Sequence, residues 1–83
     1  SPFNPSTPVR FAVPAPARVR LAVFDLQGRH VRTLRDGVVE GPGWHEARWF
    51  GTDDGGRPVA AGVYFCRLEA DGFAATMRMV LVK

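Results

Sequence analysis

Cysteine, histidine and lysine are scarce in this 83-residue chain, and it contains no long hydrophobic stretch. The single cysteine, Cys66, cannot form an internal disulfide and has no partner at metal-ligand spacing, so it is predicted to be a small buried hydrophobic residue. No apolar run approaches the roughly 20 residues that a membrane helix needs. We therefore expect no disulfide framework, no metal site and no transmembrane segment.

Clusters of like charge are missing as well. Ten arginines and one lysine outnumber eight acidic residues, which gives a formal net charge of +3. The basic residues stand singly along the chain and form no tract of the kind that binds nucleic acid. The charge pattern predicts a solvated surface and no nucleic-acid partner.

Side chains suited to catalysis are few. Nucleophilic catalysis needs a serine, cysteine or threonine held against a base, and His30 and His45 lie outside any motif. Asp53 and Asp54 precede two glycines, but an EF-hand-like calcium loop needs carboxylates at alternating positions and a distal glutamate. Aspartates that bond their own backbone in a turn are the favoured interpretation. The sequence predicts no catalytic residue, cofactor or metal.

The chain is rich in short segments whose hydrophobic residues alternate with polar ones. This period of two is typical of half-buried β-strands, and Gly, Pro and Asp punctuate the chain at the spacing expected for a sandwich or barrel. We expect residues 9–13, 19–25, 29–35, 44–50, 62–69 and 73–82 to form strands, with Ala47 and Trp49 facing inward. The uneven spacing of Val31 and Leu34 indicates a bulge, and Asp71-Gly72 indicates a hairpin turn.

These segments predict one all-β domain, a small immunoglobulin-like antiparallel β-sandwich of six to seven strands. Residues 1–8 are expected to form a proline-rich lead-in, residues 9–83 the sandwich, and residues 36–43 a loop. Trp44, Phe50, Phe65 and Phe73 are candidates for an exposed aromatic patch, and Phe65 and Phe73 would strengthen it if they faced each other. The run from Met77 to Val82 has one charge, so an unprotected edge there would invite another strand.

Four segments in a fixed order resemble the FlgD-type immunoglobulin-like domain and its relative, the type A C-terminal sorting domain of type IX secretion substrates. They are SPFNPST, VRLAVFDLQGRHVRTL, GTDDGGRPVAAGVYFCRL and ATMRMVLVK. The family's motifs match here at Asn4-Pro5-Ser6-Thr7, Asp25 to Arg29, Trp49 with Gly51, Gly62-Val63-Tyr64, and Arg78 to Lys83. Phe50 departs from the family's Trp-Asp-Gly step, which affects a local capping contact.

The resemblance implies a non-catalytic sorting and anchoring module of a larger bacterial protein, secreted or at the cell surface, with Lys83 as the end of the parent chain. A secretion translocon would then recognise the folded surface. The residues implied in this recognition are Gly62, Tyr64, Arg78, Met79, Val80, Leu81 and Lys83. The alternative is a structural subunit or scaffold module of a filament or flagellar hook cap, which binds neighbouring subunits or further copies of itself through edge strands.

Overall fold

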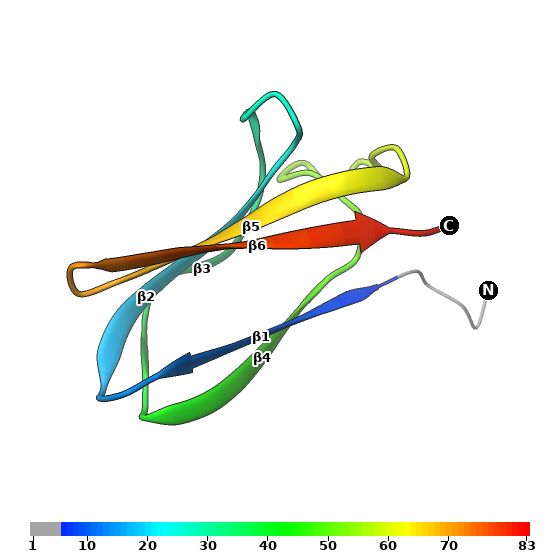
Figure 1. Ribbon diagram of the computed structural model, residues 1–83. Coiled ribbons are helices and arrows are strands. Elements are labelled where there is room, and N and C mark those ends of the chain that lie inside the picture. Colours follow the sequence, from blue (N-terminus) through cyan, green and yellow to red (C-terminus); the bar gives the residue numbers. More distant parts are fainter. Residues whose placement is uncertain (1–5) are drawn as a thin grey trace.

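A computed structural model describes residues 6–83, which form six β-strands and no helix (Figure 1). The strands are β1 (Thr7–Val13), β2 (Ala17–Phe24), β3 (His30–Glu40), β4 (Gly43–Trp49), β5 (Gly62–Ala70) and β6 (Phe73–Leu81). The predicted all-β class is confirmed. Consequently no helix in the described residues could cross a membrane.

The strands form two antiparallel sheets that pack face to face. One sheet contains β1 and β4, and the other has the order β3-β2-β5-β6. Strand β1 contacts β5 and β6, whereas β4 contacts β3, so the smaller sheet covers the larger one (Figure 1). This arrangement is the predicted immunoglobulin-like sandwich with a shared core.

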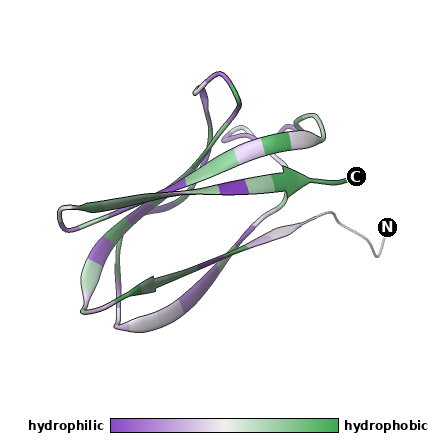
Figure 2. Ribbon diagram, viewed as in Figure 1, coloured by the Kyte–Doolittle hydropathy of each residue, from purple (hydrophilic) through white to green (hydrophobic). Residues whose placement is uncertain are grey.

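The core follows from the alternation of side chains along each strand, which Figure 2 shows as bands of hydrophobic and hydrophilic residues. Successive residues of a strand point to opposite faces, so every second side chain enters the space between the sheets. The predicted inward pair, Ala47 and Trp49, is buried, and Trp49 is 1% exposed. The other buried core residues are Val9, Phe11, Val13, Ala17, Val19, Leu21, Val23, Tyr64, Cys66, Leu68, Ala70, Met79 and Leu81.

Strand β3 corrects the predicted loop at residues 36–43. It continues to Glu40, so only Gly41 and Pro42 separate it from β4. The pairing of β2 with β3 shifts register at three places, which confirms the irregularity inferred from Val31 and Leu34. Gly37 has φ of +73°, a conformation that glycine adopts readily, and this keeps the Asp36-Gly37 pair within the strand.

At the beginning of the chain, strand β1 includes Thr7 and Pro8, which had been assigned to the lead-in. Thr7 pairs with Trp49 and Pro8 with Arg48. The remainder of the predicted lead-in, residues 1–5, lies outside the described residues.

The β5–β6 hairpin confirms the predicted turn but corrects the expected aromatic pair. Asp71 and Gly72 have φ of +34° and +79°, as the tight turns favoured in hairpins require. This turn sets Phe73 opposite Ala70 and Phe65 opposite Arg78, so the two phenylalanines do not face each other. Phe65 is also partly buried rather than exposed.

Gly51 lies where the chain leaves β4, buried beside the last core residue of β6. Its φ is +71°, and a Cβ built there would lie 3.0 Å from Leu81 Cδ2 and 3.1 Å from Leu81 Cδ1. Both the backbone and the close approach therefore require glycine at this position.

We expect Gly51→Ala to lower the free energy of unfolding more than Gly28→Ala does. Gly28 has φ of +82° but open space around it, so both variants incur a backbone cost of about 1–2 kcal/mol. Crowding against Leu81 adds about 1 kcal/mol or more at position 51. Urea unfolding of the two variants measures the difference, and equal losses would contradict this account of the Leu81 contact.

Candidate functional site

Two turns of the sequence form Asp-x-x-Gly-Arg have the same hydrogen bonds. In the first turn, the backbone amides of Gln27 and Arg29 each donate to Asp25 Oδ1 at 2.9 Å, and Arg29 Nε donates to Asp25 Oδ2 at 2.8 Å. The backbone closes the turn, because the Asp25 amide donates to the Arg29 carbonyl and the Gly28 amide to the Asp25 carbonyl. One carboxylate thus accepts three hydrogen bonds from two residues of its own turn.

The second turn, Asp53 to Arg57, repeats this pattern. Asp53 Oδ1 accepts from the amides of Gly55 and Arg57, and Oδ2 accepts from Arg57 Nε at 3.0 Å. Gly56 has φ of +81°, against +82° at Gly28. The Asp53 bonds confirm the predicted turn-forming role of this aspartate. The repeat itself was not predicted, although the matching spacing of Asp, Gly and Arg in the two segments could have indicated it.

These bonds lower the pKa of both aspartates. For Asp25, the largest cause is the backbone amide of Arg29, and the Arg29 guanidinium adds to it. For Asp53, the corresponding groups of Arg57 act in the same way. Hydrogen bonds to a carboxylate favour its ionised form. The two carboxylates are therefore fully engaged in their own turns and are poor candidates for acid–base chemistry or metal binding.

The second turn docks on the start of β3. The Asp54 amide donates to the Val31 carbonyl, and Asp54 Oδ1 accepts from the Thr33 amide at 2.9 Å. Arg32 Nη1 donates to the Asp53 carbonyl at 2.8 Å. These bonds fix the long β4–β5 connection against the four-stranded sheet. Within residues 6–83, no three potential ligand side chains lie together as a metal site would need.

Tyr64 is one of the predicted recognition residues, and the structure places it in the core. It is 7% exposed, and its hydroxyl donates to the Ala60 carbonyl at 2.6 Å. A tyrosine near the start of a strand that bonds backbone a few residues upstream is the tyrosine corner of immunoglobulin-like sandwiches. Gly62, between these two residues, is partly buried. Tyr64 thus fixes the corner and offers almost no surface to a partner.

The predicted recognition residues of β6 divide between the two faces of the strand. Met79 and Leu81 are 7% and 2% exposed, and both belong to the core. Arg78 and Val80 point outward, opposite Phe65 and Val63 of β5. Lys83 is exposed after the strand, and its ammonium donates to the Val59 carbonyl. The structure therefore brings only part of the predicted set to one accessible surface.

The cysteine and the histidines have structural surroundings. Cys66 is fully buried, as predicted, and burial raises the pKa of its thiol to about 12. His45 stacks on Phe11 and lies 3.3 Å from a Glu40 carboxylate oxygen, and His30 lies 3.5 Å from one of Asp54. The thiol is thus a neutral group away from solvent, and neither imidazole lies beside it.

The exposed aromatic residues do not form one patch. Trp44 and Phe50 stand at the beginning and just beyond the end of β4, and Phe73 begins β6. The Arg10 guanidinium lies over the Trp44 ring, 5.7 Å from its centroid. The proposed aromatic patch is therefore not assembled from these three side chains.

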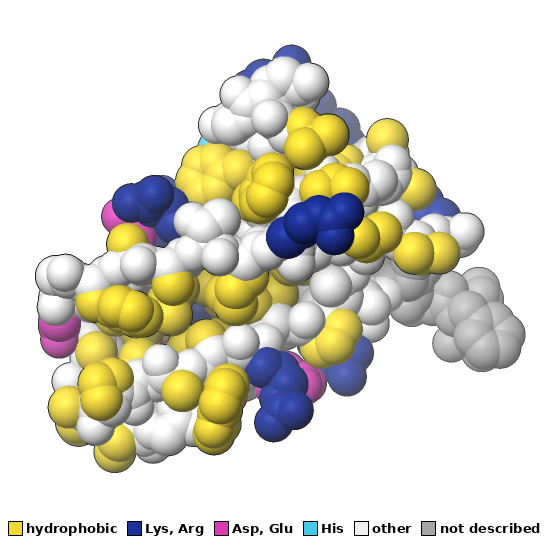
Figure 3. Space-filling model, viewed as in Figure 1, with side chains coloured by type: hydrophobic (Ala, Val, Ile, Leu, Met, Phe, Trp, Pro, Cys, Tyr) yellow, Lys and Arg dark blue, Asp and Glu magenta, His cyan; other side chains and the backbone are white. Residues whose placement is uncertain are grey.

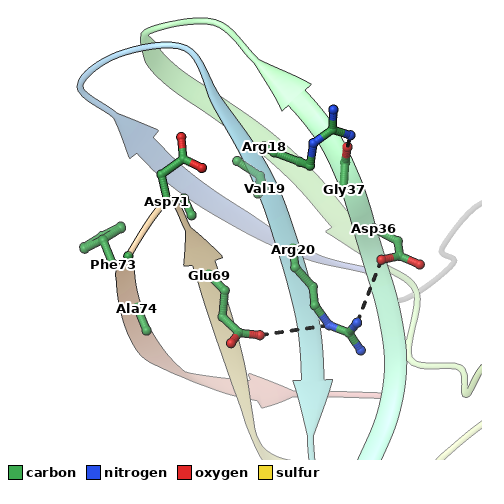
Figure 4. A pocket seen from close by; sticks show the side chains of 11 residues that line it. Arg18, Val19, Arg20, Asp36, Gly37, Glu69, Asp71, Phe73 and Ala74 are labelled. Carbon is green, nitrogen blue, oxygen red and sulfur yellow. Dashed lines mark hydrogen bonds and ion pairs between the residues drawn. The ribbon is translucent and has the colours of Figure 1, made fainter.

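A shallow hollow of about 490 Å³ lies on the outer face of the four-stranded sheet, the face turned away from β1 and β4 (Figure 4). Arg20 stands between Asp36 and Glu69, at 3.8 and 4.0 Å. Arg18 Nη1 donates to the Gly37 carbonyl at 2.8 Å. These exposed side chains form a ladder of opposite charges across three strands, which is a common way to cover a sheet.

The sandwich, the tyrosine corner and the two Asp-x-x-Gly-Arg turns agree with the result of comparison with known families. Residues 1–72 match the family model described as FlgD Ig-like domain. The chain belongs to the FlgD Ig-like family. Neither the curated proteins nor the solved structures give a significant match. Membership makes this FlgD Ig-like domain a structural module, and the surfaces left for function are the sheet edges and the outer face of the larger sheet.

Acid should weaken this FlgD Ig-like domain through its two turns. Because the pKa values of Asp25 and Asp53 are lowered in the folded chain, their ionised forms stabilise it at pH values above the unfolded pKa of about 3.9. This contribution is lost as the pH falls through the folded values. We expect Asp25→Asn with Asp53→Asn to reduce stability near neutral pH and to flatten its decline below about pH 4.

Urea unfolding measured over a pH series tests this expectation. The matched control is Asp36→Asn with Asp71→Asn, which removes the same charge from sites outside the two turns. An equally flattened decline in the control would show that overall charge, and not the turn bonds, sets the acid response.

Proposed function

We propose that the domain is a non-catalytic protein-binding module of an assembly outside the cell, related to the flagellar hook, and that it associates with neighbouring subunits through strand β6. The observation that carries this proposal is the edge of β6, which within residues 6–83 pairs with β5 alone. Unpaired backbone amides and carbonyls on such an edge are a template for another strand.

Among the edge strands, β6 has the fewest features that hinder pairing. It runs in unbroken register over nine residues and has one charged residue, Arg78. By contrast, β3 has three register shifts and several charges, β1 contains Pro8, and β4 has the two charged residues Glu46 and Arg48. Proline, bulges and charge are the usual protections of an edge. Their scarcity in β6 favours it as the strand that binds a partner.

The side chains support a role without chemistry. The thiol is buried, the turn aspartates bond their own backbone, and the charged residues of the outer face pair with one another. A secreted or cell-surface location fits a hook-related domain, and we include it in the proposal. We likewise propose that the domain needs no cofactor and binds no nucleic acid.

Association through β6 predicts that charge added to this strand blocks it. We expect the weight-average mass of the domain to rise with concentration, and Val80→Lys to weaken association by roughly tenfold or more, about 1.4 kcal/mol. Val39→Lys on β3 is the matched control, because Val39 and Val80 are both exposed valines on edge strands, at 60% and 46%. Light scattering over a concentration series measures both. A strictly monomeric wild type, or equal effects of the two variants, would contradict association through β6.

A second candidate function, sorting by a type IX secretion machine, is favoured by the exposed end of the β5–β6 pair. Arg78 and Val80 lie outward beside Val63 and Phe65, and Lys83 follows them. Deleting the last six residues would also remove Met79 and Leu81 from the core, so it would test folding together with recognition. Substituting only the exposed residues tests recognition without disturbing the fold.

We expect a reporter carrying this domain at its C-terminus to be exported by a host with the type IX machinery. Arg78→Glu combined with Val80→Glu should strongly reduce export without unfolding the domain, since both side chains are exposed. Val39 is exposed on a different strand, β3, so Val39→Glu serves as the control for added charge. Normal export of the double variant, with circular dichroism showing a folded chain, would contradict the sorting hypothesis.

A further inference from the structure

The two sheets differ in width, and this leaves one side of the sandwich open. Four strands span about 14 Å between the first and last backbone, whereas two strands span about 5 Å. Strand β1 lies over β5 and β6. Among the described residues, β4 is its one strand partner, so its free edge is on the side of the β6 edge. In Figure 1, β1 and β6 lie nearest each other toward the chain ends and diverge toward the β1–β2 turn and the β5–β6 hairpin. We call this opening the β1/β6 seam.

The side chains of β6 that face the seam are only partly covered. Met79 and Leu81, at one end, are 7% and 2% exposed, but Phe73 at the other end is 48% exposed. Ala75 and Met77, which lie on the same inward face, are partly exposed. Every second residue along half of β6 is therefore an apolar side chain without full cover, which is the pattern that a neighbouring strand would bury.

The opposite side of the sandwich is closed by polar contacts. Glu40 on β3 accepts from Arg35 Nε at 3.3 Å and lies 3.3 Å from His45 of β4, and Arg35 Nη2 reaches the Glu46 carbonyl. Among residues 6–83, no ion pair or side-chain hydrogen bond joins β1 to β5 or β6 in the same way. The seam thus lacks the polar closure that completes the other side.

At the end of the seam near Phe73 lies a largely apolar hollow of about 280 Å³. It lies between the β1–β2 turn and the β5–β6 hairpin. Its lining consists of Val13, Pro14, Ala15, Pro16, Ala17, Ala70 and Phe73, with Asp71 as the one charged residue. The space-filling view shows hydrophobic side chains gathered along this opening on the side away from the two chain ends (Figure 3). A polar ligand would find few partners here, whereas an apolar side chain would fit.

We infer that the β1/β6 seam binds one extended strand of another polypeptide, with apolar residues at alternate positions facing in and acidic residues facing out. The strand pairs with the free edge of β1 from Val9 to Val13, beyond Pro8, and covers Phe73, Ala75 and Met77. This inference deepens the proposed protein-binding function by naming a second docking place, on β1 rather than β6, and the chemistry of its partner.

Three observations favour a strand as the occupant. The β1 edge offers backbone amides and carbonyls, which a strand satisfies and a helix or small molecule does not. The uncovered side chains recur with the period of a strand. The described residues supply six strands, and a constant-type immunoglobulin sandwich has seven. Arg10 is the one charged residue of β1 and faces solvent, which favours acidic residues on the outward side of the added strand.

A direct test uses a short synthetic peptide, Glu-Val-Thr-Val-Glu-Val-Thr-Val-Glu, with blocked ends. The controls are a peptide of the same composition without alternation and one with lysine in place of glutamate. Nuclear magnetic resonance titration of the methyl groups of Ala75, Met77 and Met79 reports occupancy of the seam. We expect saturable shifts at Ala75 and Met77 with the alternating acidic peptide, and binding at least roughly tenfold weaker with either control.

A matched pair of variants locates the site. Ala74 and Ala75 are neighbours on β6, but Ala74 is exposed on the outer face and Ala75 faces the seam. Ala75→Glu should weaken peptide binding by roughly tenfold or more, whereas Ala74→Glu should leave it unchanged. If Ala75→Glu does not fold, the methyl shifts of the wild type still decide the location.

Several results would overturn the inference. Equal binding of the alternating and non-alternating peptides, or shifts confined to β3, would show that no strand enters the seam. Self-association that shifts Ala75 and Met77 without any peptide would identify the occupant as a second copy of the chain. Association through β6 is tested independently, because we expect it to respond to substitution of Val80 on the outer face and not to substitution of Ala75. Its failure would therefore leave the peptide result to be judged by itself.

Discussion

Trp49 and Tyr64 meet edge to face with ring centroids 4.8 Å apart, and the rest of the sandwich depends on this contact. Trp49 ends a strand of the smaller sheet, and Tyr64 lies near the start of a strand of the larger one. Each ring also has a polar group that must be satisfied: the indole N–H donates to the Thr52 carbonyl at 2.8 Å, and the tyrosine hydroxyl donates to the Ala60 carbonyl. The same two residues therefore join the sheets and hold both ends of the connection between them.

The size of the chain explains why so much polar chemistry is used for structure. A domain of this length buries a thin core, so the connections between strands need support from hydrogen bonds. The repeated Asp-x-x-Gly-Arg turns supply it, since each carboxylate satisfies two backbone amides and one guanidinium. The Arg29 and Arg57 side chains are 76% and 80% exposed, so the ion pairs add little by themselves. The ordered backbone is the larger effect, and it ties the β4–β5 connection to β3.

The sequence allowed the strands, the inward residues and the hairpin turn to be predicted, because each is a local consequence of side-chain alternation or of turn residues. It did not give the extent of β3, where bulges and Gly37 let a strand continue through an Asp-Gly pair that usually ends one. The family resemblance also led to the wrong expectation that Tyr64, Met79 and Leu81 are exposed for recognition, whereas all three are buried. A family motif can be maintained by core packing as well as by recognition, and the motif alone does not distinguish the two. Which face of β6 is covered depends on the width of the opposing sheet, and no local pattern reports that width.

The same width governs where function can reside. A sandwich with equal sheets buries both inward faces and leaves loops, sheet edges and outer faces for binding. Here two strands cover four, so β6 is accessible both along its backbone edge and along part of its inward face. Backbone groups on the free edge of β1 can bind any strand, whereas the adjacent row of Phe73, Ala75 and Met77 favours a strand with the matching alternation. In the β1/β6 seam, the β1 edge can therefore supply affinity and the row of β6 side chains specificity, which is what a small module without a deep pocket needs to choose a partner.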